Sequence, residues 1–217
     1  MTEAEEIEAG NSPPGSIYTI GHSNHSIETF IGLLHQHKIQ VLIDTRSSPF
    51  SRYAPQFNRD NLKTSVQEAG LKYGFFGRHL GGRPEDENLY DENGHVLYSE
   101  VAKSFLFNDG IERLLGGLSK FRTAILCSEE DPNVCHRRLL VSRVLFSLGI
   151  SVLHIRGSGS VQSEEELRSL EDAEKCRQRS LFEDGGFEGD GFKEQTASWK
   201  SIQSVLRKAP LPAFSDD

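Results

Sequence analysis

Two cysteines, a histidine and two arginines surround one short acidic loop in the stretch ILCSEEDPNVCHRRLL. Cys127 ends an apolar run, whereas Cys135 and His136 follow the loop, where the next helix is expected to begin. A thiol becomes nucleophilic when a histidine, a fixed positive charge or a helix N-terminus stabilises its thiolate. Cys127, Cys135 and His136 are therefore candidate catalytic residues, and Arg137 is a candidate ligand for an anionic substrate. Cys135 is expected to be the more acidic thiol, because it lies nearer the helix N-terminus.

Other interpretations of these two cysteines stay open. Free cysteines are among the side chains most often buried, so both could be small apolar groups of the core. A structural zinc site is disfavoured, because the two cysteines are too far apart for a C-x₂₋₄-C pair. Distant histidines such as His22 or His79 would have to complete such a site. We therefore expect no metal and no other cofactor.

Two further polar clusters follow apolar runs that are typical of strands. One has the sequence GHS and the other the sequence DTR, and an acidic residue also follows Cys127. Taken singly, an Asp-x-Arg motif is often only a salt bridge, and a histidine often fills a gap in the core. That interpretation weakens if all three clusters end strands of one parallel sheet, because such sheets bind ligands beyond the carboxyl ends of their strands. The candidates in these clusters are His22, Asp44 and Glu129 as catalytic groups, and Gly21, Ser23 and Arg46 as substrate-binding groups.

Strand and helix signals alternate along the middle of the chain. Ser26 and Asp131 are suitable helix N-caps, and Gly70 and Gly149 are suitable helix terminators. The alternation predicts an α/β fold: a single domain with a mostly parallel sheet flanked by helices. Short apolar runs predict strands over 16–23, 40–46, 71–77, 122–127 and 150–155. Apolar residues at helical spacing predict helices over 26–39, 59–70, 100–120 and 131–149.

The formal net charge is −8, and the excess of acidic residues lies at the two ends of the chain. We expect a disordered acidic leader over 1–15, the α/β core over 16–156, and a polar helix with an acidic flexible tail over 157–217. Ser163 and Glu166 form a capping-box pattern at the start of that helix. No apolar run is long enough to cross a membrane, and no signal-peptide pattern is present. The expected location is therefore cytoplasmic, where an odd number of cysteines stays reduced.

Arginines and aromatic residues are interleaved over residues 46–83, in and between two long polar loops expected at 47–59 and 77–98. Basic side chains with aromatic stacking surfaces are typical of proteins that bind single-stranded nucleic acid. Loops beside active sites have similar compositions, so the signal does not separate the two functions. The residues concerned are Arg46, Arg52, Arg59, Arg78 and Arg83, with Tyr53, Phe57, Phe75 and Phe76.

Several separated motifs resemble the family called domain of unknown function 488, in matching order over residues 17–155. They are TIGHS, LIDTRSSPFSR, the pair FN at 57–58, LGG at 80–82, and ILCSEEDPNVCHRRLL. Thr45 is a departure, since similar proteins tend to have valine there. The resemblance implies a shared site whose recurrent positions correspond to Gly21, His22, Ser23, Asp44, Arg46, Pro49, Ser51, Gly81, Gly82, Cys127, Glu129, Cys135, His136 and Arg137. It thereby adds Ser51, Gly81 and Gly82 to the substrate-binding candidates.

The sequence thus predicts an enzyme with a Cys/His/Arg pocket at the carboxyl ends of the strands, acting on a small anionic or nucleotide-like ligand. The alternative is a module that binds a nucleotide or nucleic acid without catalysis. Sulfur transfer as in rhodaneses and phosphoryl transfer as in cysteine phosphatases rank lower. The loops of those enzymes are short and glycine-rich, whereas SEEDPNV is acidic and would repel sulfate or phosphate. The sequence does not decide between an enzyme and a binding module.

Overall fold

The computed structural model describes residues 15–183 and 199–204, without the side chains of 178–183. The acidic leader expected over 1–15 lies outside this part except for Gly15, as does most of the tail expected after the polar helix. None of the described helices is both long and apolar enough to cross a membrane.

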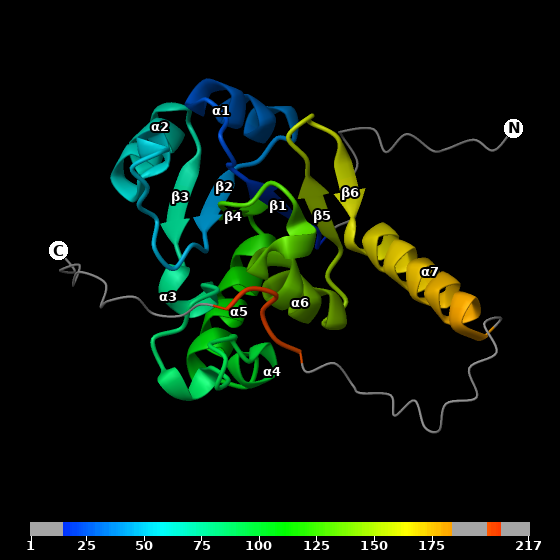
Figure 1. Ribbon diagram of the computed structural model, residues 1–217. Coiled ribbons are helices and arrows are strands. Elements are labelled where there is room, and N and C mark those ends of the chain that lie inside the picture. The colour runs from blue at the N-terminus through cyan, green and yellow to red at the C-terminus, as the bar shows by residue number, and fades with distance from the viewer. Residues whose placement is uncertain (1–14, 184–198, 205–217) are drawn as a thin grey trace, which may run out of the picture.

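A six-stranded sheet with the order β3-β2-β4-β1-β5-β6 forms the centre of the fold (Figure 1). Its first five strands in sequence are parallel and confirm the strands expected from the apolar runs. The strand β6 (Val161–Ser163) pairs antiparallel with β5 and was not expected, because three partly exposed residues give no apolar run. The α/β fold with a mostly parallel sheet is thus confirmed. The parallel strands are β1 (Ile17–Gly21), β2 (Val41–Asp44), β3 (Lys72–Phe75), β4 (Thr123–Cys127) and β5 (Val152–Ile155).

The strand order brings the three polar clusters of the sequence together, because β4 lies between β1 and β2. In the register of these strands, Gly21 pairs with Cys127 and Asp44 pairs with Leu126. The last residues of β1, β2 and β4 therefore end at nearly the same level, and the segments that follow them leave from one edge. That edge is where parallel α/β sheets bind their ligands.

Helices cover both faces of the sheet, and each face has its own apolar core (Figure 1). Neighbouring strand residues divide between the two cores: Leu126 belongs to one and Ile125 to the other. On the Leu126 face lie α1 (Ile27–Gln36) and α2 (Arg59–Glu68), and on the Ile125 face lie α5 (Phe105–Leu118) and α6 (Arg143–Ser147). The other helical segments are α3 (Gly77–Leu80), α4 (Tyr98–Val101), α7 (Glu164–Glu183), 3₁₀ turns at Pro55–Phe57, Glu87–Leu89 and Pro132–Val134, and a π-helix at Arg137–Ser142.

Most helix ends follow their sequence signals. At the start of α1 the Ser26 hydroxyl accepts a hydrogen bond from an amide of the first turn at 3.2 Å. Gly70 and Gly149 have φ of +79° and +80°, the left-handed conformation that ends a helix and that glycine adopts without strain. The capping box of α7 is also confirmed, since the Glu166 amide donates to the Ser163 hydroxyl and the Ser163 amide donates to the Glu166 carboxylate.

The helix expected over 131–149 is wrong at its start. Asp131 instead caps the 3₁₀ turn Pro132–Val134, and Cys135 is extended, with φ −118° and ψ 140°. The π-helix Arg137–Ser142 then leads into α6. An N-cap aspartate followed by proline begins any helical turn, so the sequence does not reveal that this turn ends after three residues.

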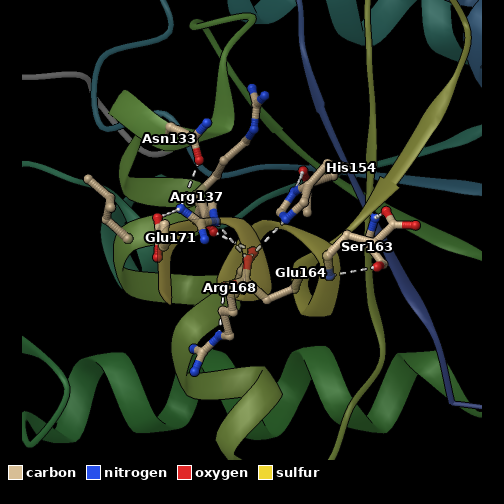
Figure 2. A network of polar contacts seen from close by, with 12 residues as sticks. Asn133, Arg137, His154, Ser163, Glu164, Arg168 and Glu171 are labelled. Atoms are coloured by element: carbon tan, nitrogen blue, oxygen red, sulfur yellow. Dashed lines mark hydrogen bonds and ion pairs between the residues drawn. The ribbon is translucent and has the colours of Figure 1, made fainter. Parts of the chain in front are cut away.

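A buried ionic network joins α7 to the sheet (Figure 2). The Glu164 carboxylate accepts hydrogen bonds from His154 Nε2 at 3.1 Å and from Arg138 Nε at 3.0 Å. Arg168 donates to the same carboxylate at 2.9 Å. Burial alone would raise the pKa of Glu164, but the His154 hydrogen bond and the Arg138 charge bring it below its usual value. Glu164 is therefore an anion, and it shares the buried guanidinium of Arg138 with Glu171.

Glu164→Ala is expected to lower the free energy of unfolding by about 3 kcal/mol, because a buried guanidinium loses one of its two carboxylate partners. Urea unfolding followed by circular dichroism measures the change. The matched control is Glu165→Ala, the exposed next residue of the same helix, whose effect should stay within about 0.5 kcal/mol. Equal losses in the two variants would contradict the role given to the network.

Candidate functional site

A cavity of about 230 Å³ opens beyond the carboxyl ends of β2 and β4. Its lining comes from the segments that follow these two strands, from the loop before α4, from the first residue of α4 and from the segment 199–204. The sequence candidates in the lining are Arg46, Gly82, Cys127, Glu129, Cys135 and His136. The other candidates lie behind this lining or beside it.

Cys127, Cys135 and His136 form a compact group in the pocket wall, the thiol–imidazole cluster. The Nδ1 atom of His136 lies 3.4 Å from Cys127 Sγ and 3.9 Å from Cys135 Sγ. The ligand atoms of the three side chains all lie within 4.8 Å of one another. Both cysteines are buried, with exposed fractions of 6% and 2%. The two cysteines are thus not only buried apolar groups, because both thiols also lie close to a histidine nitrogen beside a cavity.

The His136 ring is held in one orientation. Its Nε2 atom lies 3.2 Å from the carbonyl oxygen of Thr45. A carbonyl only accepts hydrogen bonds, so Nε2 carries a proton and Nδ1 is the atom presented to the two thiols. A Cβ at Gly82 would lie 2.7 Å from Cγ of His136, so only glycine lets the loop backbone pack this closely against the ring.

The two thiols have opposite pKa shifts. A hydrogen bond from Cys135 and the charge of His136, opposed by burial, lower the pKa of Cys127 well below its usual value. Burial and the neighbouring Cys127 raise the pKa of Cys135. These directions run opposite to the expectation that Cys135 is the more acidic thiol. Cys135 lies in extended backbone before the π-helix, and it stabilises the Cys127 thiolate as a hydrogen-bond donor.

Arg137 shapes the loop between the two cysteines. Its side chain is fully buried, and Nη1 and Nη2 donate to the carbonyl oxygens of Glu129 and Glu130. The Glu129 carbonyl also packs against the end of β1, where a Cβ at Gly21 would lie 1.8 Å from it. Arg137 and Gly21, both expected to bind substrate, thus position the loop from inside, and neither contributes to the pocket lining.

Asp44 and Arg46 form a fixed pair at the end of β2. Asp44 Oδ1 accepts a hydrogen bond from Arg46 Nε at 2.8 Å, and Oδ2 accepts one from Arg46 Nη2 at 2.6 Å. The Tyr73 hydroxyl donates to Asp44 Oδ2 at 2.8 Å, and burial raises the pKa of Tyr73, so this donor stays protonated. Asp44 is fully buried, and Arg46 is a lining residue of the pocket. Nη1 of Arg46 makes no hydrogen bond within the part of the chain that the structure describes.

His22 lies beside the pocket and not in its lining. Its ring stacks on Phe57 with the centroids 4.3 Å apart, and its Nδ1 atom lies 2.8 Å from the Ser23 carbonyl oxygen. Burial and then the charge of Arg46 lower the pKa of His22 to about 4. The imidazole is therefore neutral at pH 7, with the proton on Nδ1 and the lone pair on Nε2.

The remaining candidates lie at the edges of the site. Glu129 is exposed at the rim of the pocket. Ser23 is partly exposed with a φ of +46°, and the Ser51 hydroxyl accepts hydrogen bonds from two amides of its own loop. A Cβ at Gly81 would lie 2.3 Å from the Ser47 hydroxyl oxygen, so this glycine allows the second long loop to approach the first.

Two parts of the pocket wall were missed by the sequence analysis. Tyr98 lines the pocket and is 3% exposed, and no local signal distinguishes it from other aromatic residues. The segment 199–204 also lines the pocket, through residues that include Ser201. Its Trp199 Nε1 donates to the Leu139 carbonyl at 2.7 Å. Trp199 is the only tryptophan of the chain and stands in a polar stretch, a signal that could have indicated a docking segment.

The folded protein lowers the pKa of His22 from 6.5 to about 4, so protonation of this ring favours the unfolded chain. The stabilisation is complete above pH 6.5 and is lost as the pH falls towards 4. We expect His22→Asn to reduce the fall in unfolding free energy over this window by roughly 2–3 kcal/mol. Urea titrations at a series of pH values test this, with the exposed His35→Asn as control. A His22→Asn curve parallel to that of the wild type would contradict the assignment.

The model of the family Domain of unknown function DUF488 matches residues 26–144, more than half of the chain. The matched range includes the whole thiol–imidazole cluster and Arg46, whereas β1 with Gly21 and His22 lies before it. No curated protein and no solved structure gives a significant match to the chain. The chain therefore belongs to the DUF488 family, whose function is unknown.

Proposed function

We propose that the chain is an enzyme that acts on a small anionic, nucleotide-like substrate in the pocket beside the thiol–imidazole cluster. One observation carries this proposal: the cluster and Arg46, whose guanidinium is held by Asp44, line the same open cavity. A purely structural cysteine cluster needs no cavity, and a purely structural salt bridge does not need to border one. Reactive side chains and a binding cation in one cleft are the usual composition of an active site.

Arg46 is the proposed anchor for the anion. Its two bonds to Asp44 fix the plane of the guanidinium and leave Nη1 for a ligand. With an exposed fraction of 6%, this donor lies largely out of water, where a charge-assisted hydrogen bond is stronger than at the surface. The Asp44 charge weakens the net attraction, so Arg83 at the exposed rim supplies a second cation. The Ser47 hydroxyl is a further polar group of the lining.

The size of the pocket limits the substrate. Its 230 Å³ is less than the roughly 300–1,000 Å³ of pockets that enclose drug-sized ligands. One phosphorylated or carboxylated group with a few attached atoms suits this volume. The rest of a nucleotide-like substrate would extend past the rim at Arg83 and Glu129.

Two side chains near the cluster suit proton transfer, which attack by a thiol or by water requires. Glu129 is a carboxyl side chain exposed at the rim of the pocket. His22 is neutral at pH 7 and interacts electrostatically with Arg46 and Cys127. The cytoplasmic location expected from the sequence would keep both thiols of the cluster reduced.

Nucleic-acid binding without catalysis is the second candidate. Phe50 and Tyr53 are 64% and 96% exposed on the loop that carries Arg52, so both are accessible for stacking with bases. Against it, Phe57 is 1% exposed and belongs to the core, so it offers no stacking surface. Rhodanese-like sulfur transfer remains less favoured, because the loop between Cys127 and Cys135 contains no glycine, whereas the loops of those enzymes are glycine-rich.

Inorganic phosphate, pyrophosphate or a nucleoside monophosphate is expected to bind the full chain, and isothermal titration calorimetry at constant ionic strength measures the affinity. Arg83→Ala should weaken binding about tenfold, because it removes a charged donor worth about 1.5 kcal/mol. Arg52→Ala, an exposed arginine outside the lining, is the matched control and should leave the affinity unchanged. Equal affinities of the two variants would contradict anion binding in the pocket. Oligonucleotide binding that weakens steeply with salt and is lost in Tyr53→Ala would favour the second candidate.

A variant that leaves the pocket arginines in place can show whether the cluster is needed for turnover rather than for binding. His136→Asn is expected to lower turnover by at least about 100-fold and to change anion affinity little, because the cluster supplies reactivity and Arg46 supplies binding. Turnover is measured by phosphorus and proton NMR on a panel of small phosphate and carboxylate esters. Cys176→Ser, on the exposed side of α7, is the control with unchanged turnover. Tight anion binding with no turnover in any member of the panel would favour a binding module.

A further inference from the structure

The thiol–imidazole cluster has the spacing of a zinc site. Tetrahedral zinc, with bonds of about 2.3 Å to sulfur and about 2.0 Å to nitrogen, places neighbouring sulfur and nitrogen ligands about 3.5 Å apart. The Nδ1 atom of His136 lies 3.4 Å from Cys127 Sγ and 3.9 Å from Cys135 Sγ. Both nitrogen–sulfur distances are therefore close to those of a tetrahedral zinc site.

Hydrogen bonds and a nearby positive charge support the three side chains in the way that is common around zinc ligands. The Thr45 carbonyl accepts the Nε2 proton of His136 and so orients Nδ1 as a ligand. The backbone amide of Arg137 donates to Cys135 Sγ at 3.4 Å, a bond that favours a thiolate. The buried Arg137 guanidinium makes no ion pair with a carboxylate in the described part of the chain, so its positive charge is available to offset two thiolates.

The donor set and the pocket decide the kind of metal site. Two thiolates and an imidazole favour Zn²⁺ over Mg²⁺ or Ca²⁺, which prefer oxygen ligands. Among the described residues the group contains only Cys127, Cys135 and His136, and all three line the pocket. Three protein ligands with a fourth position open to a cleft are typical of catalytic zinc. A closed structural site needs four protein ligands, for which the spacing of the two cysteines is unfavourable. An open site with three protein ligands does not have this requirement.

We propose that Cys127, Cys135 and His136 bind one Zn²⁺ ion whose fourth ligand is a water molecule in the pocket. The inference rests on the proposed function and names its reactive group, because zinc converts its water to hydroxide near neutral pH. The hydroxide oxygen would bond to the phosphorus or carbonyl carbon of the substrate, and the bond to the leaving group would break. The proton that the water loses would pass through the solvent of the pocket to that leaving group. The reaction is a hydrolysis, and the cysteines act as ligands, not as nucleophiles.

The test measures zinc in the full chain purified without chelators. Plasma mass spectrometry is expected to find one zinc ion per chain. Cys127→Ser and Cys135→Ser should each lose most of the metal, whereas Cys176→Ser should retain it, because Cys176 is exposed on α7 away from the cluster.

If the cysteine variants do not fold, a second measurement tests the metal site in the wild-type chain. The wild-type chain is stripped with a chelator and titrated with Co²⁺, and circular dichroism monitors its fold. Binding at the cluster should produce the thiolate-to-cobalt charge-transfer absorption of a tetrahedral site. Iodoacetamide should then label Cys176 with or without metal, and Cys127 only without it.

The outcomes separate the metal site from the proposed function. A chain with no zinc and no cobalt–thiolate absorption, but with Arg83-dependent phosphate binding, would overturn the metal site and leave Cys127 as the nucleophile of the enzyme. A chain with one zinc ion that is lost in the cysteine variants, but with no anion binding and no turnover, would support the metal site and contradict the proposed function.

Discussion

The buried guanidinium of Arg137 is the interaction on which the site depends. By donating to the carbonyl oxygens of Glu129 and Glu130, it bends the loop after β4 back over the end of β1. Gly21 makes this approach sterically feasible, because any side chain there would collide with the Glu129 carbonyl. The bend replaces the regular helix expected after Asp131 and returns Cys135 to the neighbourhood of Cys127. Burial of one arginine therefore creates the thiol–imidazole cluster.

The rest of the fold holds this bend in place. Arg138, the next residue, donates to Glu164 at the start of α7 and to Asn133 in the same loop, so these bonds link α7 to the cysteine loop. On the pocket side, the Thr45 carbonyl orients the His136 ring. The reactive groups and the proposed anion anchor thus have little freedom to move, which is the condition for catalysis by positioned groups.

The sequence predicted the parts of this arrangement that depend on local signals. The apolar runs indicated five strands, and Gly70 marked a helix end with the expected positive φ. Because parallel strands end at one edge of the sheet, the sequence also predicted that residues such as Arg46 and Cys127 would line one pocket. The burial of Arg137 could not be predicted, because arginine is mostly exposed in folded proteins. Among the described residues, its guanidinium here donates to backbone carbonyls and not to a carboxylate. The position of β4 between β1 and β2 and the docking of Trp199 depend on contacts between distant parts of the chain, which composition and periodicity do not contain.

X-ray absorption at the zinc edge reports the atoms around the metal in the full chain in solution, so it shows directly whether both cysteines bind zinc. We expect two sulfur neighbours at about 2.3 Å and two nitrogen or oxygen neighbours at about 2.0–2.1 Å, from Cys127, Cys135, His136 and a water molecule. Addition of phosphate should perturb only the lighter shell, since the anion would enter from the pocket side. A shell of oxygen and nitrogen alone would contradict the account, because it would place the metal away from the two thiols.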